Sequence, residues 1–325
     1  MEYRSYADLV KAVRGGLFQL PTDIDLIVGV PRSGLLVAGL ISLYLNKPLT
    51  DLDGLVENRL ISSGKTKNIT KSCIPHRCKK ALIVEDTVCS GSSINAAKER
   101  LEQSGFTGRY LTYAVYVAPG MERVVDHYVE VVANPRFFEW NIYHHKEHLP
   151  NACCNIDGFV CRNPTAEEND DGERYLRFLK SADPLILPTA KVGVFVTARL
   201  EKYRAETEAW LNSHGVVYNE LVMLNCTAEE RRERNLHALF KASIYKRRHD
   251  MVLFIESDAR QAEEIMRLSG KPVLCVENGV LYTTEQIIVK TKRARKNRSR
   301  WNHFRNKVAR ISLFRLVYKI IKGKQ

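Results

Sequence analysis

Short apolar runs alternate with segments of helical periodicity along most of this 325-residue chain. The clearest run, Ala81-Leu-Ile-Val84, contains only apolar residues and predicts a buried strand. Repetition of an apolar strand followed by a helix is typical of a parallel sheet that helices cover. The chain is therefore predicted to have an α/β fold with two such segments, each a doubly wound parallel sheet.

The first segment occupies the N-terminal half. Its predicted strands are 25–30, 81–84, 111–117 and 128–133, and its predicted helices are 35–45 and 94–104. Residues 57–68 between these elements are polar and show neither the helical nor the strand periodicity of apolar residues, so they predict a long exposed loop. Long loops in compact domains are often functional.

The second segment begins after residues 151–169, which are rich in Cys, Asn, Asp and Pro. Its predicted strands are 192–196, 216–224, 251–255 and 273–276, and its predicted helices are 201–214, 229–248 and 259–269. Hydrophobic residues make up 45% of the chain, which is enough apolar material for two cores. We predict a first domain over residues 1–150, a second over 151–287 and a tail over 288–325.

The excess positive charge of the chain lies in the tail. Residues 290–325 contain 14 of the 50 Lys and Arg residues and none of the 37 Asp and Glu residues, so the rest of the chain has a net charge of −1. A basic run over 292–300 precedes Trp301 and Phe304, and residues 312–322 then place apolar side chains on one broad helical face. This pattern favours a basic amphipathic helix on an anionic membrane surface. A helix packed on its own protein and a nucleic-acid arm are the alternatives.

Three further features limit the class of protein. The chain has no run of about 18 apolar residues, and its N-terminus is polar where a signal peptide needs an apolar segment. Its eight cysteines follow no disulfide-scaffold spacing. We expect a cytoplasmic protein with reduced thiols that is peripheral on the inner face of the membrane.

The stretch Leu82-Ile-Val-Glu-Asp-Thr-Val-Cys-Ser-Gly-Ser-Ser93 joins an apolar strand to two acids and a turn of small residues that opens a helix. The turn can direct backbone N–H groups and hydroxyls at one phosphate, and the helix N-terminus adds its positive end. Glu85 and Asp86 can accept hydrogen bonds from vicinal sugar hydroxyls or hold a metal. The stretch predicts a site for a ribose phosphate, with an ordinary strand–turn–helix junction as the alternative.

This stretch resembles the phosphoribosyl pyrophosphate motif of type I phosphoribosyltransferases, apart from Glu at 85 and Ser at 90, 92 and 93, where Thr or Gly is usual. The resemblance implies that Glu85 and Asp86 contact the ribose hydroxyls. It implies a 5-phosphate site formed by Thr87, Ser90, Gly91, Ser92 and Ser93. The family holds pyrophosphate in a loop after its first core strand, which corresponds here to Pro31, Arg32, Ser33 and Gly34.

The polar loop over 57–68 is similar to the flexible loop with which this family closes its active site. Arg59, Lys65 and Lys67 would neutralise the departing diphosphate, unless the loop is simply a solvated basic segment. The family's reaction displaces pyrophosphate at C1 of the ribose with inversion, and Mg²⁺ is chelated by diphosphate and ribose oxygens. In the hood region Trp140, with Phe137 or Phe138, is expected to stack on an acceptor, or to belong to an interdomain core.

In the second half, Cys154-Asn-Ile-Asp-Gly-Phe-Val160 resembles the Asp-x-Asp-Gly motif of haloacid-dehalogenase-type phosphatases. Matches to the later motifs follow in order at Thr197, Lys241 and the pair Glu256 and Asp258. The resemblance implies a Rossmann-like fold, an acid role for Asp157, and phosphate binding by Thr197 and Lys241. It implies Mg²⁺ ligands at Asn155, Asp157, Glu256 and Asp258. An unrelated α/β domain with polar strand ends is the alternative.

Position 155 departs from this phosphatase pattern. The residue is Asn where the family has its carboxylate nucleophile, and an amide cannot form an aspartyl-phosphate. The second domain is therefore expected to bind a phosphate monoester and to hydrolyse it poorly or not at all. The sequence is compatible with a natural pseudo-phosphatase and with an Asp-to-Asn substitution made to trap a complex, and the intact neighbouring motifs favour the second explanation.

The combination of a phosphoribosyltransferase-like half, a phosphatase-like half and a basic tail resembles the bacterial ribofuranosyl-transfer enzymes of capsule and O-antigen synthesis. It implies transfer of 5-phosphoribosyl from phosphoribosyl pyrophosphate to a glycan or lipid-linked glycan, followed by removal of the 5-phosphate. The expected cofactor is Mg²⁺, and residues 290–325 are expected to bind the membrane rather than nucleic acid. The oligomeric state stays open, a homodimer included. The rival functions are a nucleobase or orotate-type phosphoribosyltransferase with a fused pseudo-phosphatase, and a regulator that senses phosphoribosyl pyrophosphate and binds nucleic acid.

Overall fold

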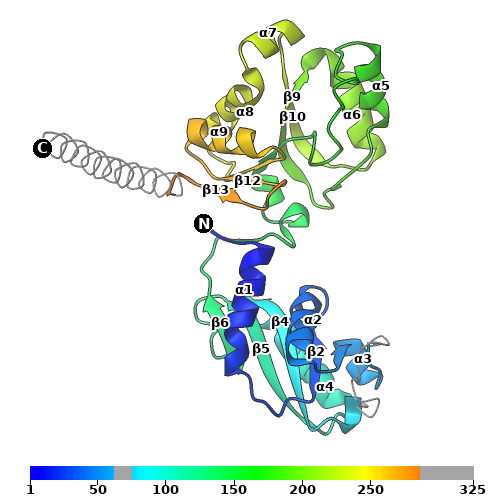
Figure 1. Ribbon diagram of the computed structural model, residues 1–325, viewed down its shortest axis with the longest axis vertical. Helices are drawn as coiled ribbons and strands as arrows, with labels where there is room; N and C mark the ends of the chain where they lie inside the picture. The colour runs from blue at the N-terminus through cyan, green and yellow to red at the C-terminus, as the bar shows by residue number, and fades with distance from the viewer. Residues whose placement is uncertain (62–74, 286–325) are drawn as a thin grey trace, which may run out of the picture. The chain divides into compact units, whose positions relative to one another are not determined.

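The computed structural model describes residues 1–61 and 75–285 and divides the chain into two compact units, Met1–Tyr143 (unit 1) and His144–Gln325 (unit 2). Each unit is built around one main β-sheet with helices packed against it (Figure 1). The predicted α/β class with parallel sheets is thereby confirmed. Lys65, Lys67 and the predicted tail helix lie outside the described residues.

The main sheet of unit 1 has five parallel strands in the order β3-β2-β4-β5-β6. They are β2 (Leu26–Gly29), β3 (Leu49–Asp51), β4 (Lys80–Val88), β5 (Arg109–Val117) and β6 (His127–Val131). Because β3 and β4 lie on opposite sides of β2, the direction of winding reverses between β2 and β4. Open α/β sheets bind ligands outside the carboxyl ends of their strands at such a reversal.

Two hydrophobic cores flank this sheet, because successive residues of a strand point to opposite faces. Leu82 and Val84 of β4 pack with α1 (Tyr6–Gly16) and α2 (Ser33–Leu45). Ala81 and Ile83 of the same strand pack with α3 (Leu52–Val56) and α4 (Ser92–Gln103). Burial of both faces explains why residues 81–84 of β4 are continuously apolar.

The alternation in the sequence does not predict several short elements of unit 1. They are α1, α3, β3 and a separate two-stranded parallel sheet of β1 (Glu2–Arg4) and β7 (Arg136–Phe138). Side-chain caps account for the two helices: Ser5 and Asp8 form a capping box at α1, and Asp51 accepts a hydrogen bond from Gly54 N at α3. Single 3-10 turns occur at Leu17–Gln19 (η1), Pro75–Arg77 (η2), Ile142–His144 (η3) and Leu149–Asn151 (η4).

The sheet of unit 2 has the order β10-β9-β8-β11-β12-β13, and all its pairs are parallel except β12 with β13. The strands are β8 (Ala152–Cys154), β9 (Val192–Leu200), β10 (Tyr218–Leu224), β11 (Leu253–Glu256), β12 (Val273–Cys275) and β13 (Leu281–Tyr282). Here the winding reverses between β8 and β11. This second reversal marks the corresponding place for a ligand in unit 2.

Helices cover both faces of this second sheet. They are α5 (Glu173–Ser181), α6 (Arg204–Ser213), α7 (Ala228–Glu233), α8 (Leu236–Arg247) and α9 (Ala259–Ser269), with a 3-10 turn η5 (Glu201–Tyr203) before α6. Residues of α8 and α9 share one core with β9 and β11, and α5 and α6 lie on the other side of β9 and β10 (Figure 1). None of the helices in the described part of the chain has the length and apolar composition of a membrane span.

The structure corrects three predicted elements. The single helix predicted over 229–248 is wrong, because Asn235 adopts a left-handed backbone (φ 47°) between α7 and α8. β4 does not stop at Val84, because its ladder with β5 continues to the pair Val88–Val117. β9 likewise continues to Leu200. Glu85 and Asp86 therefore lie inside a strand and not after it.

Candidate functional site

The loop after β2 and the acid pair of β4 meet where the winding of the first sheet reverses. Val30 N donates to Val84 O at 2.9 Å. A Cβ on Gly34 would lie 2.5 Å from Val84 O and 3.2 Å from Glu85 Cα. Only a residue without a side chain permits this approach of α2 to β4, so Gly34 brings residues 30–34 beside the acid pair.

Asp86 is 1% exposed, and both of its carboxylate oxygens accept hydrogen bonds. Ser33 Oγ donates to Oδ1 and Trp140 Nε1 donates to Oδ2, each at 2.7 Å. Burial raises the pKa of the Asp86 carboxyl, and the two hydrogen bonds act against that rise. Two segments that are far from Asp86 in the sequence thus hold its carboxylate in one orientation.

Glu85 and Thr87 each contribute a buried oxygen that lacks a hydrogen-bond partner in the described part of the chain, namely Glu85 Oε2 and Thr87 Oγ1. Burial and then the charge of Asp86 raise the pKa of Glu85 to about 8. Buried polar atoms in proteins are nearly always hydrogen-bonded. These two oxygens therefore fit a site that a ligand hydroxyl or a cation such as Mg²⁺ completes.

The turn between β4 and α4 presents small polar side chains. Gly91 has φ 79°, and a Cβ there would lie 2.9 Å from Val124 Cγ1, so the turn requires glycine. Ser90 Oγ and Ser92 Oγ are 3.0 Å apart, and Ser90, Ser92 and Ser93 are exposed. The hydroxyls and the N-terminus of the twelve-residue α4 are accordingly open to an anion.

Trp140 packs within unit 1, and its indole N–H donates a hydrogen bond to Asp86. Its ring stacks on Phe138 at 4.9 Å between centroids and lies 6.3 Å from that of Tyr116. Phe137 and Phe138 are buried, so neither offers a ring face to an acceptor, which corrects that expectation. The position of Trp140 beside the acid pair is a feature that sequence reasoning missed.

The basic residues expected to meet the diphosphate are placed only in part. Pro31 and Arg32 are exposed in the loop after β2. Arg59 is half exposed and pairs with Glu57 at 3.2 Å and with Asp51 at 3.7 Å. Arg59 must therefore leave these carboxylates before it can neutralise a diphosphate.

Gly34→Ala is expected to destabilise unit 1 by about 1–3 kcal/mol, because the added methyl group collides with the β4 backbone. Gly39→Ala in the same helix has nothing within 4 Å of its Cβ and is expected to be neutral or to stabilise by roughly 0.5–1 kcal/mol. Urea denaturation of both variants measures the contrast. Equal stability of the two variants would show that α2 does not approach β4 as closely as described.

Glu85 is expected to make unit 1 less stable as the pH rises from about 4.5 to about 8. In this window the unfolded chain has released the proton that folded Glu85 still holds, so ionisation favours unfolding. The free energy of unfolding is expected to fall by roughly 1.4 kcal/mol per pH unit at most. Chemical denaturation at several pH values should show that Glu85→Gln removes this slope, whereas Glu99→Gln, an exposed acid of α4, keeps it. Identical slopes in all three proteins would assign the pH dependence to other groups.

In unit 2, polar side chains meet at the reversal between β8 and β11. Glu256 ends β11, and its Oε2 accepts from Lys241 Nζ of α8 at 2.7 Å. Its Oε1 accepts from Asn155 Nδ2, directly after β8, at 3.0 Å. All three side chains are buried. The structure thus brings together three predicted residues that are up to 101 positions apart.

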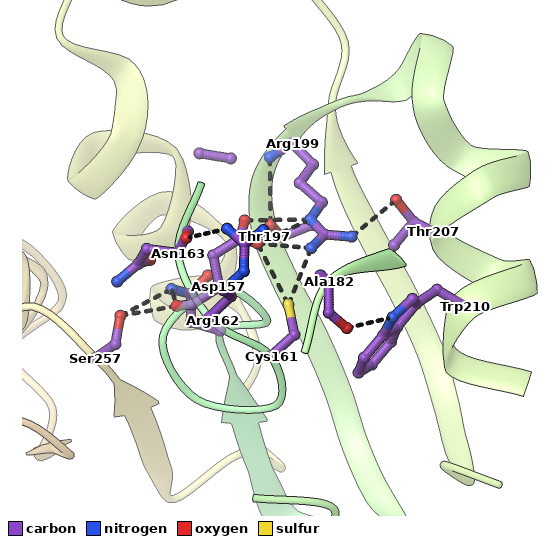
Figure 2. A network of polar contacts seen from close by, with 12 residues as sticks. Asp157, Cys161, Arg162, Asn163, Ala182, Thr197, Arg199, Thr207, Trp210 and Ser257 are labelled. Carbon is purple, nitrogen blue, oxygen red and sulfur yellow. Dashed lines mark hydrogen bonds and ion pairs between the residues drawn. The ribbon is translucent and has the colours of Figure 1, made fainter. Parts of the chain in front are cut away.

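A second ion pair joins the half-buried Asp157 to the buried Arg199 (Figure 2). Arg199 Nη2 donates to Asp157 Oδ1 at 2.6 Å and Nε donates to Oδ2 at 3.1 Å, and Nη2 also lies 3.2 Å from Cys161 Sγ. Thr197 is fully buried, and its Oγ1 accepts from Arg199 N at 3.2 Å. The partner of Asp157 is therefore a residue to which the sequence analysis assigned no role, although it lies only two positions after Thr197.

A cavity of about 640 Å³ opens beside these groups. Four of the predicted residues line it: Asn155, Asp157, Lys241 and Asp258. Sequence reasoning missed further lining residues, among them the basic side chains Arg162, Arg199, Arg231 and His237. Burial, then the charges of Arg231 and Lys241, lower the pKa of His237, so its ring is neutral at neutral pH.

The expected Mg²⁺ ligands of unit 2 do not fit a cation as they stand. Glu256 is bound to Lys241 and Asp157 to Arg199, while Asp258 Oδ1 caps α9 by accepting from Gln261 N at 2.7 Å. The described residues contain no cluster of three or more His, Cys, Asp or Glu that could hold a metal. Both carboxylate oxygens of Glu256 and of Asp157, and Oδ1 of Asp258, instead accept from protein donors.

Residues 3–149 match the family model described as a phosphoribosyl transferase domain. Unit 1 accordingly contains a phosphoribosyl transferase domain, which indicates a transferase, and its main sheet is parallel. The match covers slightly less than half of the chain and leaves unit 2 almost untouched. A comparison with curated proteins gives no match.

Solved structures similar to the chain align with it at low identity. A purine phosphoribosyltransferase from Pyrococcus horikoshii is 19% identical, with 42% of this chain and 92% of that chain covered at a TM-score of 0.31. A xanthine-guanine-hypoxanthine phosphoribosyltransferase from Helicobacter pylori is also 19% identical, with 43% and 93% covered at 0.35. An orotate phosphoribosyltransferase from Aeropyrum pernix is 17% identical, with 39% and 70% covered at 0.28. At such scores the likenesses add no argument about substrate.

Proposed function

We propose that unit 1 transfers 5-phosphoribosyl from phosphoribosyl pyrophosphate to an acceptor hydroxyl and releases pyrophosphate. The observation that carries this proposal is the juxtaposition of Asp86, Glu85 and Ser33 at the reversal of a phosphoribosyl transferase sheet. The exposed serine turn at the N-terminus of α4 suits the 5-phosphate, and the buried acids suit the ribose hydroxyls. Positive charge that develops at C1 is stabilised by the Asp86 carboxylate.

Pyrophosphate leaves toward the loop that contains Arg32, with Arg59, Lys65 and Lys67 as further cations. Glu85, with its unpartnered Oε2, is the residue that would contact Mg²⁺, and the bound ion would neutralise charge on the diphosphate. The hydrogen bonds from Ser33 and Trp140 keep the Asp86 carboxylate in one orientation during the reaction. Catalysis on this view consists of positioning and charge stabilisation.

For unit 2 we propose a binding site for the phosphate monoester that unit 1 produces. Support comes from the cavity lined by Lys241 and Asn155, and from the strand order with its reversal beside Asn155 and Glu256. Asn155 has no carboxylate with which to attack phosphorus, so unit 2 with Asn at this position binds the monoester and does not hydrolyse it. With a carboxylate at this position, the same site would release the 5-phosphate and leave a β-ribofuranosyl residue.

For the acceptor we propose a glycan on a lipid carrier. Support comes from the pairing of a phosphoribosyl-transferring unit with a phosphate-binding unit and from the 14 basic residues of 290–325, which suit an anionic membrane surface. A nucleobase is the rival acceptor, and a nucleic-acid-binding regulator is the rival role. Co-sedimentation with anionic liposomes, lost on deletion of residues 290–325, would support the membrane assignment over a soluble base-salvage enzyme.

The deciding experiment incubates the protein with phosphoribosyl pyrophosphate, Mg²⁺ and a lipid-linked glycan preparation, and in parallel with purine bases and orotate. Mass spectrometry of the acceptor and release of pyrophosphate are measured together. A glycan that gains one phosphoribosyl unit is the expected result, because Asn155 stalls the second step. Release of pyrophosphate only with a free base would establish the rival transferase, and an intact donor in every mixture would favour the regulator.

A further inference from the structure

Arg231 differs from the other cationic side chains that line the cavity of unit 2. Three of those side chains are paired with carboxylates: Arg162 with Glu168, Arg199 with Asp157 and Lys241 with Glu256. Among the described residues Arg231 has no carboxylate within ion-pair distance. Its guanidinium is therefore not paired with a carboxylate in the described part of the chain, although Asp258 and Glu277 also line the cavity.

The Arg231 side chain is also buried and incompletely hydrogen-bonded. It is 8% exposed, and its Nη1 donates to Ala198 O near the end of β9 at 3.0 Å. Its Nε is buried with no partner in the described part of the chain. A buried guanidinium N–H without an acceptor is unfavourable, so the Nε of this cavity-lining side chain leaves room for one further acceptor, which a ligand can supply.

Arg231 and Lys241 are anchored to different strands. Lys241 is held by Glu256 of β11, Arg231 is held by Ala198 of β9, and β8 lies between those strands. Neighbouring strands are about 4.8 Å apart, so the two anchoring strands are separated by roughly 10 Å. The cavity of about 640 Å³ is much larger than one phosphate group. The neutral ring of His237 adds no third positive charge.

We propose that this cavity binds a ligand with two anionic groups. A phosphate monoester lies beside Lys241 and Asn155, and a second phosphate or carboxylate binds the Arg231 guanidinium. This inference rests on the phosphate site proposed above for unit 2. In the proposed reaction sequence the second group belongs to the acceptor, so the glycan that receives the phosphoribosyl unit is acidic.

Two matched probes test the second group. Glucose 6-phosphate has one anionic group, and 6-phosphogluconate adds a carboxylate at the opposite end of the same carbon chain. Titration calorimetry on the full chain should show that 6-phosphogluconate binds about 10-fold more tightly or better, as expected for one charge-assisted hydrogen-bonded pair. Arg231→Gln should bring the ratio of the two dissociation constants close to one and leave glucose 6-phosphate binding unchanged.

Arg232→Gln is the matched control, since it removes the same charge from an exposed position of α7 and should retain the preference. Arg231→Lys retains a positive charge and should retain part of the preference for 6-phosphogluconate. Thermal denaturation monitors folding, because loss of the bond to Ala198 O lowers the melting temperature even if no ligand uses Arg231. That structural effect would leave the ratio of the two dissociation constants unchanged.

The outcomes separate this inference from the proposal on which it rests. If Arg231→Gln weakens both probes equally, Arg231 serves the same phosphate as Lys241, and the two-group inference is overturned while the phosphate site stands. An unchanged ratio in the variant also overturns it. If neither probe binds the wild-type protein, the phosphate site of unit 2 is wrong and the inference fails with it.

Discussion

Asp86→Asn is expected to lower the rate of pyrophosphate release by about 10³-fold, which is the scale for removal of one preorganised charge-stabilising group. The carboxylate accepts from Ser33 with one oxygen and from Trp140 with the other. An amide has a single acceptor oxygen, so its NH₂ group must face one of these two donors. The Trp140 N–H cannot reverse its polarity, because indole is only a donor. The amide therefore loses the charge, and it keeps both hydrogen bonds only with its oxygen toward Trp140 and its NH₂ group donating to Ser33 Oγ.

Two further variants distinguish charge from orientation. Trp140→Phe retains the carboxylate and the ring stacking on Phe138 but removes one donor, so an intermediate loss is expected. Because the Trp140 hydrogen bond lowers the pKa of Asp86, its removal should also shift the acidic limb of the pH–rate profile upward. Asp53→Asn removes an exposed carboxylate from α3 and should have little effect.

Single-turnover release of pyrophosphate, with folding checked by circular dichroism, measures these differences. Retained turnover in a folded Asp86→Asn protein would remove the acid pair from the catalytic site. A Trp140→Phe variant with an unchanged pH profile would reduce Trp140 to a packing residue.

Asn155→Asp is expected to create hydrolysis of phosphate monoesters in unit 2, with a gain on the order of 10³-fold or more over the parent protein. The new carboxylate would stand beside Glu256, whose other oxygen is bound to Lys241. It would thus occupy the position from which a nucleophile reaches a phosphate held by that lysine. Release of inorganic phosphate from ribose 5-phosphate measures the gain.

The same substitution is expected to lower the stability of unit 2 in the absence of divalent cations. The Asn155 amide donates to Glu256 Oε1 and to Asp157 O, and a carboxylate can donate to neither. Two buried carboxylates then face one another, which is unfavourable unless a cation lies between them. Added Mg²⁺ should raise the melting temperature of Asn155→Asp but not that of the parent or of Asn155→Ser. A folded Asn155→Asp protein with neither hydrolysis nor response to Mg²⁺ would contradict the proposed site.

The sequence alone predicted most of the strands and helices, because apolar periodicity is a local property. Runs such as 81–84 must be buried on both faces, and that requirement is sufficient to predict a parallel sheet covered by helices. Prediction from apolar periodicity failed where local backbone geometry overrides it, as at Asn235. It also failed where short elements such as α1 depend on side-chain caps. The acid pair and the Ser90–Ser93 turn were also predictable, because their residues are contiguous.

The contacts between distant segments were decided only by the tertiary structure. Trp140 and Asp86 are 54 positions apart, and Arg199 and Asp157 are 42 apart, so no spacing in the sequence indicates which donor meets which carboxylate oxygen. The same holds for Arg231, whose Nη1 donates to Ala198 O near the end of β9 while its Nε has no partner in the described part of the chain. Periodicity determines which face of an element is buried, but the hydrogen-bond partner of a buried polar group depends on which elements the fold brings against that face.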